Sequence, residues 1–599
     1  MREISRPLEV IDELLEPFSA CLSVPGALPP REWREKAHFL RTLKLEDEDN
    51  FQDIPCLNET DTWLDVPSQS LVRYRCMVQD VLEPEVYPLF LQSTGALVTM
   101  KYREALPTGS HAKPLSTLET GNWATRGIYL CVPLPGESSW AIPRRGPNGA
   151  SECGPGTSAP NTVGCSCLVK LYDVDEESLK VCETVEVLGV FHMGAGAPRL
   201  HGLHVRKLPF FHPMLPYSPR WLSEGRLLCT FQRRFSGFAV RSLRDLAIQI
   251  LQEPLGGDQL AAEYVLALLV ARVYGNDGSR ALGRWSLNLS HWQEGSVDLL
   301  VRALAKLHPR VLHLPVTPET LKQRRWTPQK DFDANRLRSG LLQLAPGTLL
   351  VFDETQMDTG PLDAAGLRAV QGIRGLASEQ MLLVDFFNYE VQVPLEVNCL
   401  FISRGVSIFK AADLVLPLSP TRSSVLPKQE DVESLDGLRF LLGLIQHRTQ
   451  PLRLQQIMAV FSHDFARLRD EFREMDLGQQ TLHDTQRRQR NLCHCWWACE
   501  SYGIGCNMTR MSWCRIPGGG CFGPKPTPRP CPFVNESSFV TFDVRLPLQS
   551  SWNVQVWVAL ARAFCFTHGE EEMTVERWQS VATIERERCR RWKEFGLKA

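Results

Sequence analysis

Several features of exported and membrane proteins are missing from this sequence. The first twenty residues are acidic and amphipathic, and they lack the basic start and apolar core of a signal peptide. The most apolar long run, Ala261–Tyr274, contains Glu263 and Arg272 and is too short to span a bilayer. The 19 cysteines are too sparse in 599 residues for a secreted disulfide scaffold, so we interpret them as reduced thiols. These absences predict an intracellular protein with no membrane association.

Net charge is also nearly absent. The 66 basic side chains are balanced by 68 acidic ones, which leaves a formal net charge of −2. No global positive field therefore attracts the chain to nucleic acid, and only a local patch could do so. With 43% hydrophobic and 22% charged residues, the composition is that of a globular protein long enough for several domains.

A phosphate-binding loop is the third absence, because the pattern GxxxxGK[ST] does not occur in the chain. What is present is Leu349–Thr355, where four apolar residues lead directly into Asp353 and Glu354. This pattern predicts a buried parallel strand that delivers acids to a sheet edge, where P-loop proteins hold Mg²⁺ and polarise water. An acid strand without its phosphate loop indicates an ATPase fold that has lost its chemistry.

The strand–turn–helix unit that should carry the phosphates is Arg284–Leu307. Its turn contains the bulky Trp292, the acidic Glu294, one glycine and no lysine, whereas a phosphate cradle needs unobstructed backbone amides and a cation. ATP hydrolysis is therefore not expected. Two interpretations of Asp353 and Glu354 stay open. They form a helix N-cap or salt-bridged strand end kept for structure, which we favour, or they retain binding of Mg²⁺ or nucleotide.

No other catalytic constellation is present in the sequence. It contains no GxSxG elbow, no HExxH motif and no GxGxxG after a strand. His201 and His204 flank a predicted strand and are expected at the surface rather than as ligands. The sequence therefore names no catalytic, cofactor-binding or metal-binding residue, and it implies no cofactor.

The N-terminal part is predicted to be helical over residues 1–65. Leu8, Ile11, Leu14 and Leu15 share one helical face. We favour docking of this helix on the same chain over binding to a partner.

Residues 66–210 are predicted to form an OB-like barrel with a flexible insertion at 143–164, which is rich in proline, glycine, serine and asparagine. Apolar and polar residues alternate from Leu71 onward, which is typical of a strand. Gly189 is expected to mark a bulge or a barrel bend. The further predicted strands are Gly127–Trp140, Cys167–Tyr172 and Val185–Phe191.

An OB-like barrel can bind single-stranded nucleic acid through aromatic and basic side chains on one face. We favour the alternative that these side chains are solvated strand residues of an interaction barrel, because the chain has no excess of positive charge. The candidates are Arg73, Tyr74, Arg75, Lys101, Tyr102 and Arg103.

Residues 240–420 alternate between helical and strand patterns, which predicts an α/β domain of a degenerate AAA+-like kind without a Walker A loop. A C-terminal helical region is predicted at 435–485 and 556–599. The fold class is therefore α+β and multidomain. The predicted helices are Ser242–Leu251, Asp258–Val273 and Val297–Leu307, and the predicted strands are Arg284–Leu289, Leu349–Thr355, Val397–Ile402 and Asp413–Leu418.

The order of these segments resembles the mini-chromosome maintenance (MCM) complex-binding protein family. The resemblance covers most of the chain in the family's order. The segments that carry it are Leu71–Tyr87, Tyr129–Trp140, Cys167–Tyr172, Pro198–Leu208, Leu260–Tyr274, Gly283–Leu289, Asp331–Leu344, Leu349–Thr355, Ala412–Leu418 and Met573–Trp578.

The resemblance implies a non-catalytic nuclear protein that binds MCM helicase subunits and meets chromatin through them. It further implies roles in MCM assembly and stability, in unloading of the helicase during DNA replication, and in sister chromatid cohesion. Direct nucleic-acid binding is not expected. The alternatives are an ATP-dependent remodeller with an atypical nucleotide site and a single-stranded nucleic-acid-binding OB-fold protein.

The stretch 486–555 differs in composition from its surroundings, and the resemblance implies a continuous helical hairpin in its place. It contains seven cysteines between Cys493 and Cys531, but their spacing does not fit paired zinc knuckles. We favour a disordered insertion over a zinc module, and we expect that much of it is translated intron. Amplifying the transcript across Gln486–Val556 should give a shorter in-frame product; finding only full-length product would refute this.

Beyond this stretch the pattern is again that of folded protein. Trp557–Phe564 is the predicted continuation of the helix, and Thr574 can cap a further helix that begins at Val575. The basic Arg590 and Arg591 fit either a nuclear import signal or a solvated helix face.

Overall fold

A computed structural model gives the fold of the chain in two compact units. The first unit comprises Met1–Phe461 with Gln555–Leu597, and the second comprises Ser462–Val554 with Lys598–Ala599. No helix among the described residues is both long and apolar enough to span a membrane. The structure describes residues 2–23, 28–59, 63–93, 96–105, 112–114, 122–142, 166–172, 179–194, 196–215, 224–277, 280–293, 297–358, 360–420, 431–448, 464 and 551–595.

The N-terminal segment packs on its own chain. Leu8, Ile11 and Leu15 of α2 are buried in a core that also contains Phe90 and Leu97 of a small three-stranded sheet. The expectation of an intramolecular docking helix is therefore confirmed, whereas the small sheet was not predicted. These elements are α1 (Arg2–Ser5), α2 (Pro7–Leu15), η1 (Glu16–Ser23), α3 (Glu35–Thr42), α4 (Glu48–Gln52), η2 (Leu57–Glu59), η3 (Trp63–Asp65), β2 (Phe90–Ser93), β3 (Ala96–Thr99) and β4 (Ala112–Pro114).

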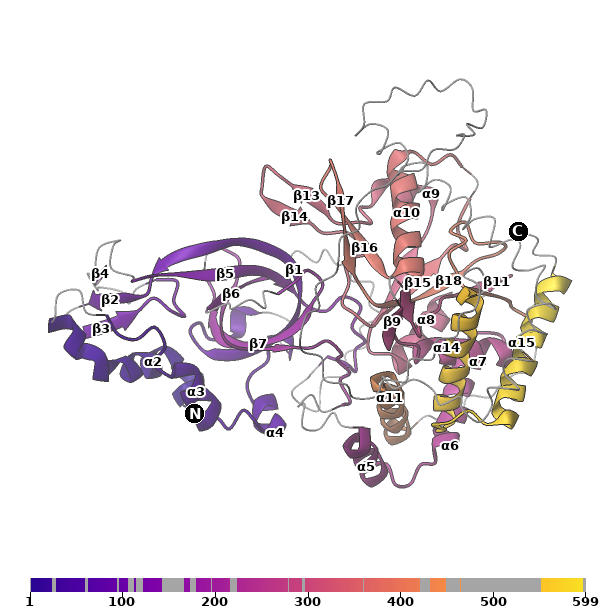
Figure 1. The fold of residues 1–599 in the computed structure, drawn as a ribbon, viewed down its shortest axis with the longest axis horizontal. Helices are drawn as coiled ribbons and strands as arrows, with labels where there is room; N and C mark the ends of the chain where they lie inside the picture. The colour runs from indigo at the N-terminus through magenta and orange to yellow at the C-terminus, as the bar shows by residue number, and fades with distance from the viewer. Residues whose placement is uncertain are drawn as a thin grey trace, which may run out of the picture. The chain divides into compact units, whose positions relative to one another are not determined.

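Five strands close into a barrel in the order β1-β5-β6-β8-β7 (Figure 1). Strands β6 and β8 are parallel, and the other neighbours are antiparallel. The register slips between Leu188 and Gly189, where an added Cβ would lie 2.3 Å from the His201 carbonyl oxygen, so the predicted bulge is confirmed. The strands are β1 (Leu71–Pro88), β5 (Trp123–Val132), β6 (Cys167–Tyr172), β7 (Thr184–His192) and β8 (Arg199–Lys207).

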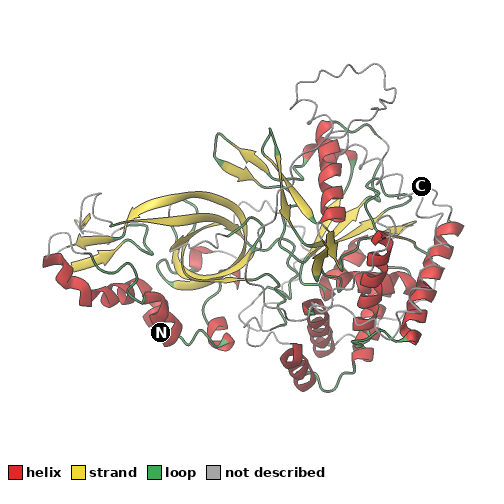
Figure 2. Ribbon diagram, in the orientation of Figure 1, coloured by secondary structure: helices red, strands yellow, loops and turns green. Residues whose placement is uncertain are grey.

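The α/β part is built on a five-stranded parallel sheet in the order β12-β15-β18-β11-β19, with helices beside it (Figure 2). Its core includes Phe352 stacked on Phe401 at 5.0 Å. The strands are β11 (Leu287–Ser290), β12 (Val311–Pro315), β15 (Thr348–Asp353), β18 (Val397–Ile402) and β19 (Leu414–Pro417). The helices are α5 (Glu224–Arg234), α6 (Val240–Gln252), α7 (Gln259–Leu269), α8 (Val297–Leu307), α9 (Pro318–Gln323), α10 (Ala364–Glu379) and α11 (Val432–His447).

The predicted strands and helices of this part are largely confirmed, with two differences. Helix α7 begins after Asp258, as predicted, but ends four residues before Val273. The Asn398 amide donates to the carbonyls of Leu268 and Ala271 at this end. Not predicted from the sequence were the helices α5, α9 and α10, the strand β12, a two-stranded sheet and a four-stranded sheet. The two smaller sheets contain β9 (Gly275–Asp277), β10 (Arg280–Leu282), β13 (Gln329–Asp331), β14 (Arg336–Arg338), β16 (Met381–Asp385) and β17 (Glu390–Pro394).

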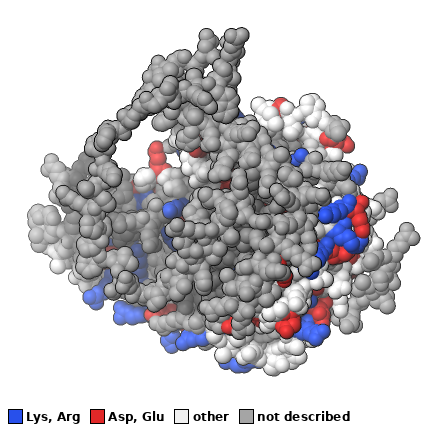
Figure 3. Space-filling view, turned by 45° about the vertical axis from the view of Figure 1, so that its right-hand side comes forward, with Lys and Arg blue, Asp and Glu red and all other residues white. Residues whose placement is uncertain are grey.

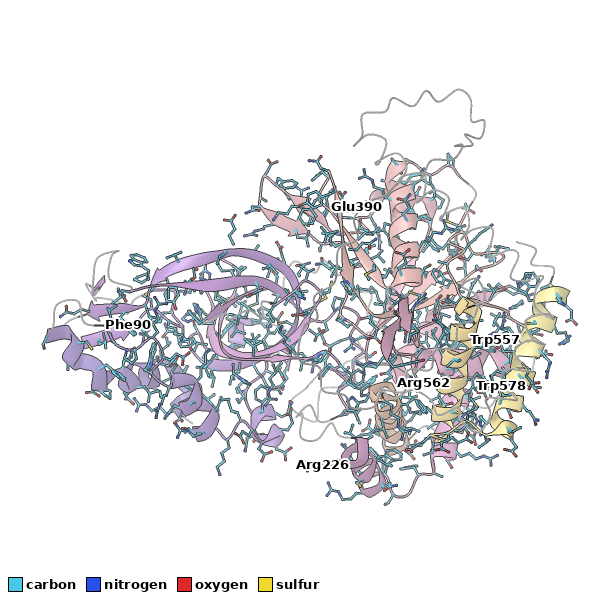
Figure 4. All side chains as sticks on the ribbon, viewed as in Figure 1. Phe90, Arg226, Glu390, Trp557, Arg562 and Trp578 are labelled. Carbon is cyan, nitrogen blue, oxygen red and sulfur yellow. The ribbon has the colours of Figure 1, made fainter. Side chains whose placement is uncertain are left out.

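The chain ends in helices α14 (Ser551–Thr567) and α15 (Val575–Glu594), on which Figure 4 labels Trp557 and Trp578. The predicted helix Trp557–Phe564 lies within α14. The Thr574 hydroxyl accepts the backbone N–H of Arg577, so the predicted cap of α15 is confirmed. The seven cysteines of the 486–555 stretch, and the start of the predicted hairpin at Thr481, lie outside the described residues.

Candidate functional site: the acid edge of the parallel sheet

The acid strand lies inside the parallel sheet, as predicted. Strand β15 has β12 on one side and β18 on the other, and all six of its residues are buried. Asp353 is its last residue and Glu354 follows it. Both carboxylates therefore stand at the carboxyl edge of the sheet, where open α/β sheets bind ligands.

The Asp353 carboxylate interacts with neighbouring residues of its own chain through both oxygens. One carboxylate oxygen accepts the backbone N–H and the hydroxyl of Thr355, at 2.9 and 2.6 Å, and the other lies 3.3 Å from Nε2 of His313 on β12. Burial opposes ionisation, but the hydrogen bonds from His313 and Thr355 outweigh it and hold the pKa of Asp353 below its ordinary value. Asp353 thus ends the strand in a local turn with Thr355.

Glu354 is buried and fastens a different segment. One of its carboxylate oxygens accepts the hydroxyl of Ser407 at 2.6 Å, and the other accepts the backbone N–H of Ile408 at 2.8 Å. Burial raises its pKa to about 7, against the opposing effect of these two hydrogen bonds. Glu354 therefore anchors the loop that joins β18 to β19. The structural interpretation is supported, although the two acids fix a turn and a loop rather than form an N-cap.

The turn that would cradle phosphates in a P-loop protein follows β11. Its first positions carry the aromatic side chains of His291 and Trp292. Trp292 is buried, and its backbone N–H donates to the Ser403 carbonyl at 3.1 Å. His291 has a φ of +58° and lies 4.6 Å, between ring centroids, from Phe595 just beyond α15. The predicted obstruction by Trp292 is thus present, and Glu294 lies outside the described residues.

The carboxylates can anchor backbone, but they do not converge on a cation with further ligands. No group of three or more His, Cys, Asp or Glu side chains in the described part of the chain is arranged to hold a metal ion. His313 and Ser407 were not predicted from the sequence as partners of the two acids. The apolar run around His313 (VLHLP) could have identified β12, but no local pattern marks Ser407.

The variant Glu354→Gln tests how much folding stability is lost when the buried Glu354 carboxylate ionises. Because its folded pKa of about 7 exceeds the ordinary 4.5, the folded state binds the extra proton between these values. Folding stability should fall as pH rises through that window, on the order of 3 kcal/mol, and reach its low level above pH 7. The variant should flatten this decline, as measured by urea unfolding between pH 5 and 8. Exposed Glu319→Gln is the control, and an unchanged decline in Glu354→Gln would contradict the assignment.

The six nucleic-acid candidates of the barrel region are buried, which corrects both interpretations offered for them. They are neither solvated nor available to a strand of nucleic acid, because N-terminal acids and barrel acids pair with the cations. The ion pairs are Arg73 with Glu59 and Glu186 at 3.1 and 3.2 Å, Arg75 with Glu137 at 2.7 Å, Lys101 with Glu35 at 2.8 Å, and Arg103 with Asp12 at 2.5 Å. Tyr74 packs edge-on against Trp63, and the Tyr102 hydroxyl donates to Glu35.

The histidine expectation is also wrong for His201, which lies within β8 and is fully buried. Its ring joins the Tyr172 hydroxyl at 2.5 Å to Glu104 at 2.8 Å, and Lys170 reaches Glu104 at 2.6 Å. Burial lowers the pKa of His201 to about 3. This network ties β6 to β8, and no local sequence pattern indicated it.

Fold and site together define a class of protein, in which one chain contains a closed barrel and an α/β domain with a five-stranded parallel sheet. The acidic side chains at the edge of this sheet form hydrogen bonds with other residues of the same chain. The family model of the mini-chromosome maintenance replisome factor matches residues 41–162 and 194–487, more than half of the chain. The chain belongs to this family.

Relatives carry the name mini-chromosome maintenance complex-binding protein. The Arabidopsis thaliana protein is 28% identical over 73% of this chain and 85% of its own length. The Homo sapiens protein is 26% identical over 65% of this chain and 78% of its own length. The Salmo salar protein is 26% identical over 70% of this chain and 80% of its own length.

Proposed function

We propose that this chain is a non-catalytic binding factor of the MCM replicative helicase. Its family and the names of its relatives support this partner. One structural observation supports a role without catalysis: Asp353 and Glu354, the acids of the strand, already accept hydrogen bonds from Thr355, Ser407 and Ile408 of the same chain.

The proposal includes a fold assignment for the barrel and another for the parallel sheet. Counted along the chain, the barrel strands have the order 1-2-3-5-4 with the third and fifth parallel, which supports an OB-like barrel. The parallel sheet has the order 2-3-4-1-5 with the acids on its third strand, the arrangement of AAA+ domains, which supports a degenerate pseudo-ATPase. The proposed limits are 1–65, 66–210, 240–420, and 435–485 with 556–599, and the last pair flanks an insertion at 486–555.

The proposed cellular role follows the family. The protein would reside in the nucleus, reach chromatin through MCM, and act in MCM assembly, stability and unloading and in sister chromatid cohesion during the cell cycle. Acidic and basic side chains lie next to one another at several places on the face in Figure 3. On α15, Arg590 pairs with Glu587 at 2.7 Å. Such pairing supports a protein partner over a nucleic-acid partner.

Purification of a tagged chain from dividing cells, with nuclease added, tests the partner. MCM subunits should be recovered at near-stoichiometric levels because the contact is between proteins. Their absence, or a recovery that nuclease abolishes, would refute the proposal.

Titration with labelled ATP and Mg²⁺ tests the absence of catalysis. We expect no micromolar binding, because the acids are already bonded and Trp292 fills the turn. Micromolar binding that Asp353→Ala abolishes would instead favour an ATP-dependent remodeller with an atypical nucleotide site.

A further inference from the structure

The outer edge of β17 differs from the β12 and β19 edges of the parallel sheet and from the β14 edge of its own sheet. The edge strand β12 donates its Val311 N–H to the Gly136 carbonyl at 2.8 Å, and the β14 edge donates Leu337 N–H to Asp80 at 2.8 Å. Arg588 covers β19 through the Val415 carbonyl at 3.0 Å. Among the described strands β17 pairs only with β16, and its residues 390–392 are exposed. An edge of this kind is a template for another strand.

The backbone groups that face outward on β17 follow from its pairing. Phe386 N–H donates to the Tyr389 carbonyl at 3.0 Å and Leu395 N–H donates to the Gln380 carbonyl at 2.9 Å, at the two ends of one antiparallel ladder. Because hydrogen-bonded pairs alternate in such a ladder, the residues paired inward between them are Val391 and Val393. Glu390 and Gln392 therefore direct their N–H and carbonyl groups outward, to where a further strand would lie.

The side chains of β17 present two different faces. Val391 and Val393 stand opposite Val384 and Leu382, which are buried, so this face continues the core. Val391 is nevertheless 39% exposed, at the point where the sheet stops. A strand added here would place its own apolar residues beside the two valines.

The other face carries unneutralised negative charge. Glu390, labelled in Figure 4, stands opposite Asp385 in the register, and no described residue forms an ion pair with it. Basic residues of this sheet also lie near acids: burial raises the pKa of Asp80, and the charges of Lys330 and Arg336 offset only part of that rise. Arg338 of β14 pairs with Asp331, and Arg368 of the neighbouring helix α10 pairs with Asp385. The charge left at the edge is acidic, which favours a basic residue on the occupant and disfavours nucleic acid.

We propose that the β17 edge binds an extended segment of an MCM subunit, in which apolar residues alternate with a lysine or arginine placed beside Glu390. The strand supplies affinity through backbone hydrogen bonds, and the valines and Glu390 supply selectivity. This inference rests on the proposed function, which names the partner.

Binding of purified MCM subunits to full-length Gln392→Pro tests the edge directly. Proline removes an outward N–H but none of the bonds to β16, so the hairpin should persist, as it does where proline stands on an edge strand. We expect the dissociation constant to rise about tenfold or more, since the bond is lost and the ring obstructs the incoming strand. Gln392→Ala keeps the N–H and is the matched control, with an unchanged dissociation constant.

A second variant keeps the test informative if Gln392→Pro fails to fold. Glu390→Lys should weaken binding several-fold in low salt and less in high salt, while exposed Glu319→Lys should not. Binding by the wild type that neither Gln392→Pro nor Glu390→Lys weakens would overturn the β17 assignment alone. No binding by the wild type would overturn the proposed function and this inference together. A wild-type dimer that Gln392→Pro converts to a monomer would show that a second copy occupies the edge, and would overturn the partner assigned here.

Discussion

Arg588→Ala should destabilise the α/β part by about 3–5 kcal/mol, the cost of leaving one member of a buried ion pair alone. The Arg588 guanidinium bonds Glu585 at 2.9 Å, and both side chains are buried on α15. The same guanidinium donates to the Val415 carbonyl at 3.0 Å, and the Tyr264 hydroxyl of α7 donates to Glu585. The substitution would therefore leave a buried carboxylate uncompensated and uncover the edge of β19.

Thermal and urea unfolding of the full chain measure this effect. A loss of this size corresponds to a fall of about 10 °C in the melting temperature of a domain of this length. Arg590→Ala is the matched control on the same helix, because Arg590 is exposed and its replacement should leave the melting temperature nearly unchanged. Equal melting temperatures for the two variants would contradict the docking of α15. Because this helix follows the 486–555 stretch, a large effect would also show that the chain beyond that stretch belongs to the fold.

Arg73→Glu should prevent the barrel from folding. Arg73 lies between the buried Glu59 and Glu186, and it also donates to the carbonyl oxygens of Gln52 and Ile54. A carboxylate at this position would place three buried acids together and remove the bonds that hold the N-terminal segment on the strand. The expected loss is about 5 kcal/mol or more, comparable with the whole stability of a domain.

Circular dichroism and solubility of the purified variant measure this loss. Arg41→Glu, on the exposed surface of α3, is the control and should fold normally. The single-stranded nucleic-acid alternative predicts a different result, namely a folded Arg73→Glu protein that has lost a salt-dependent affinity. That outcome would contradict the burial of Arg73.

The local elements were largely predictable because their signals are local. Apolar patterns predicted β15, β18 and α8. The threonine before a helical pattern predicted the start of α15, and a glycine in an alternating strand predicted the bulge at Gly189. The strand β12 was missed although its apolar run could have identified it, because one histidine interrupts a run of only five residues. The hairpins of the four-stranded sheet were missed because each strand is only three to five residues long.

The positions of charged residues were the least predictable. Alternation in β1 correctly gave a strand, but it could not show that the N-terminal segment covers its outer face. Arg73 and Arg75 therefore resembled solvated residues, although both are buried in ion pairs. An alternating pattern shows only which residues share a face of the strand. Whether that face is buried depends on what packs against it.

The sequence by itself determined the strand that ends in Asp353 and Glu354 and the absence of a lysine-bearing phosphate loop, since both are properties of adjacent residues. Only the tertiary structure decided what the acids do. His313 reaches Asp353 across a parallel ladder and Ser407 reaches Glu354 from a loop 53 residues away. It also left β17 paired on one side only, with β16, among the described strands. Such contacts join segments far apart in the chain, and their geometry is fixed by the packing of the whole sheet rather than by any local pattern.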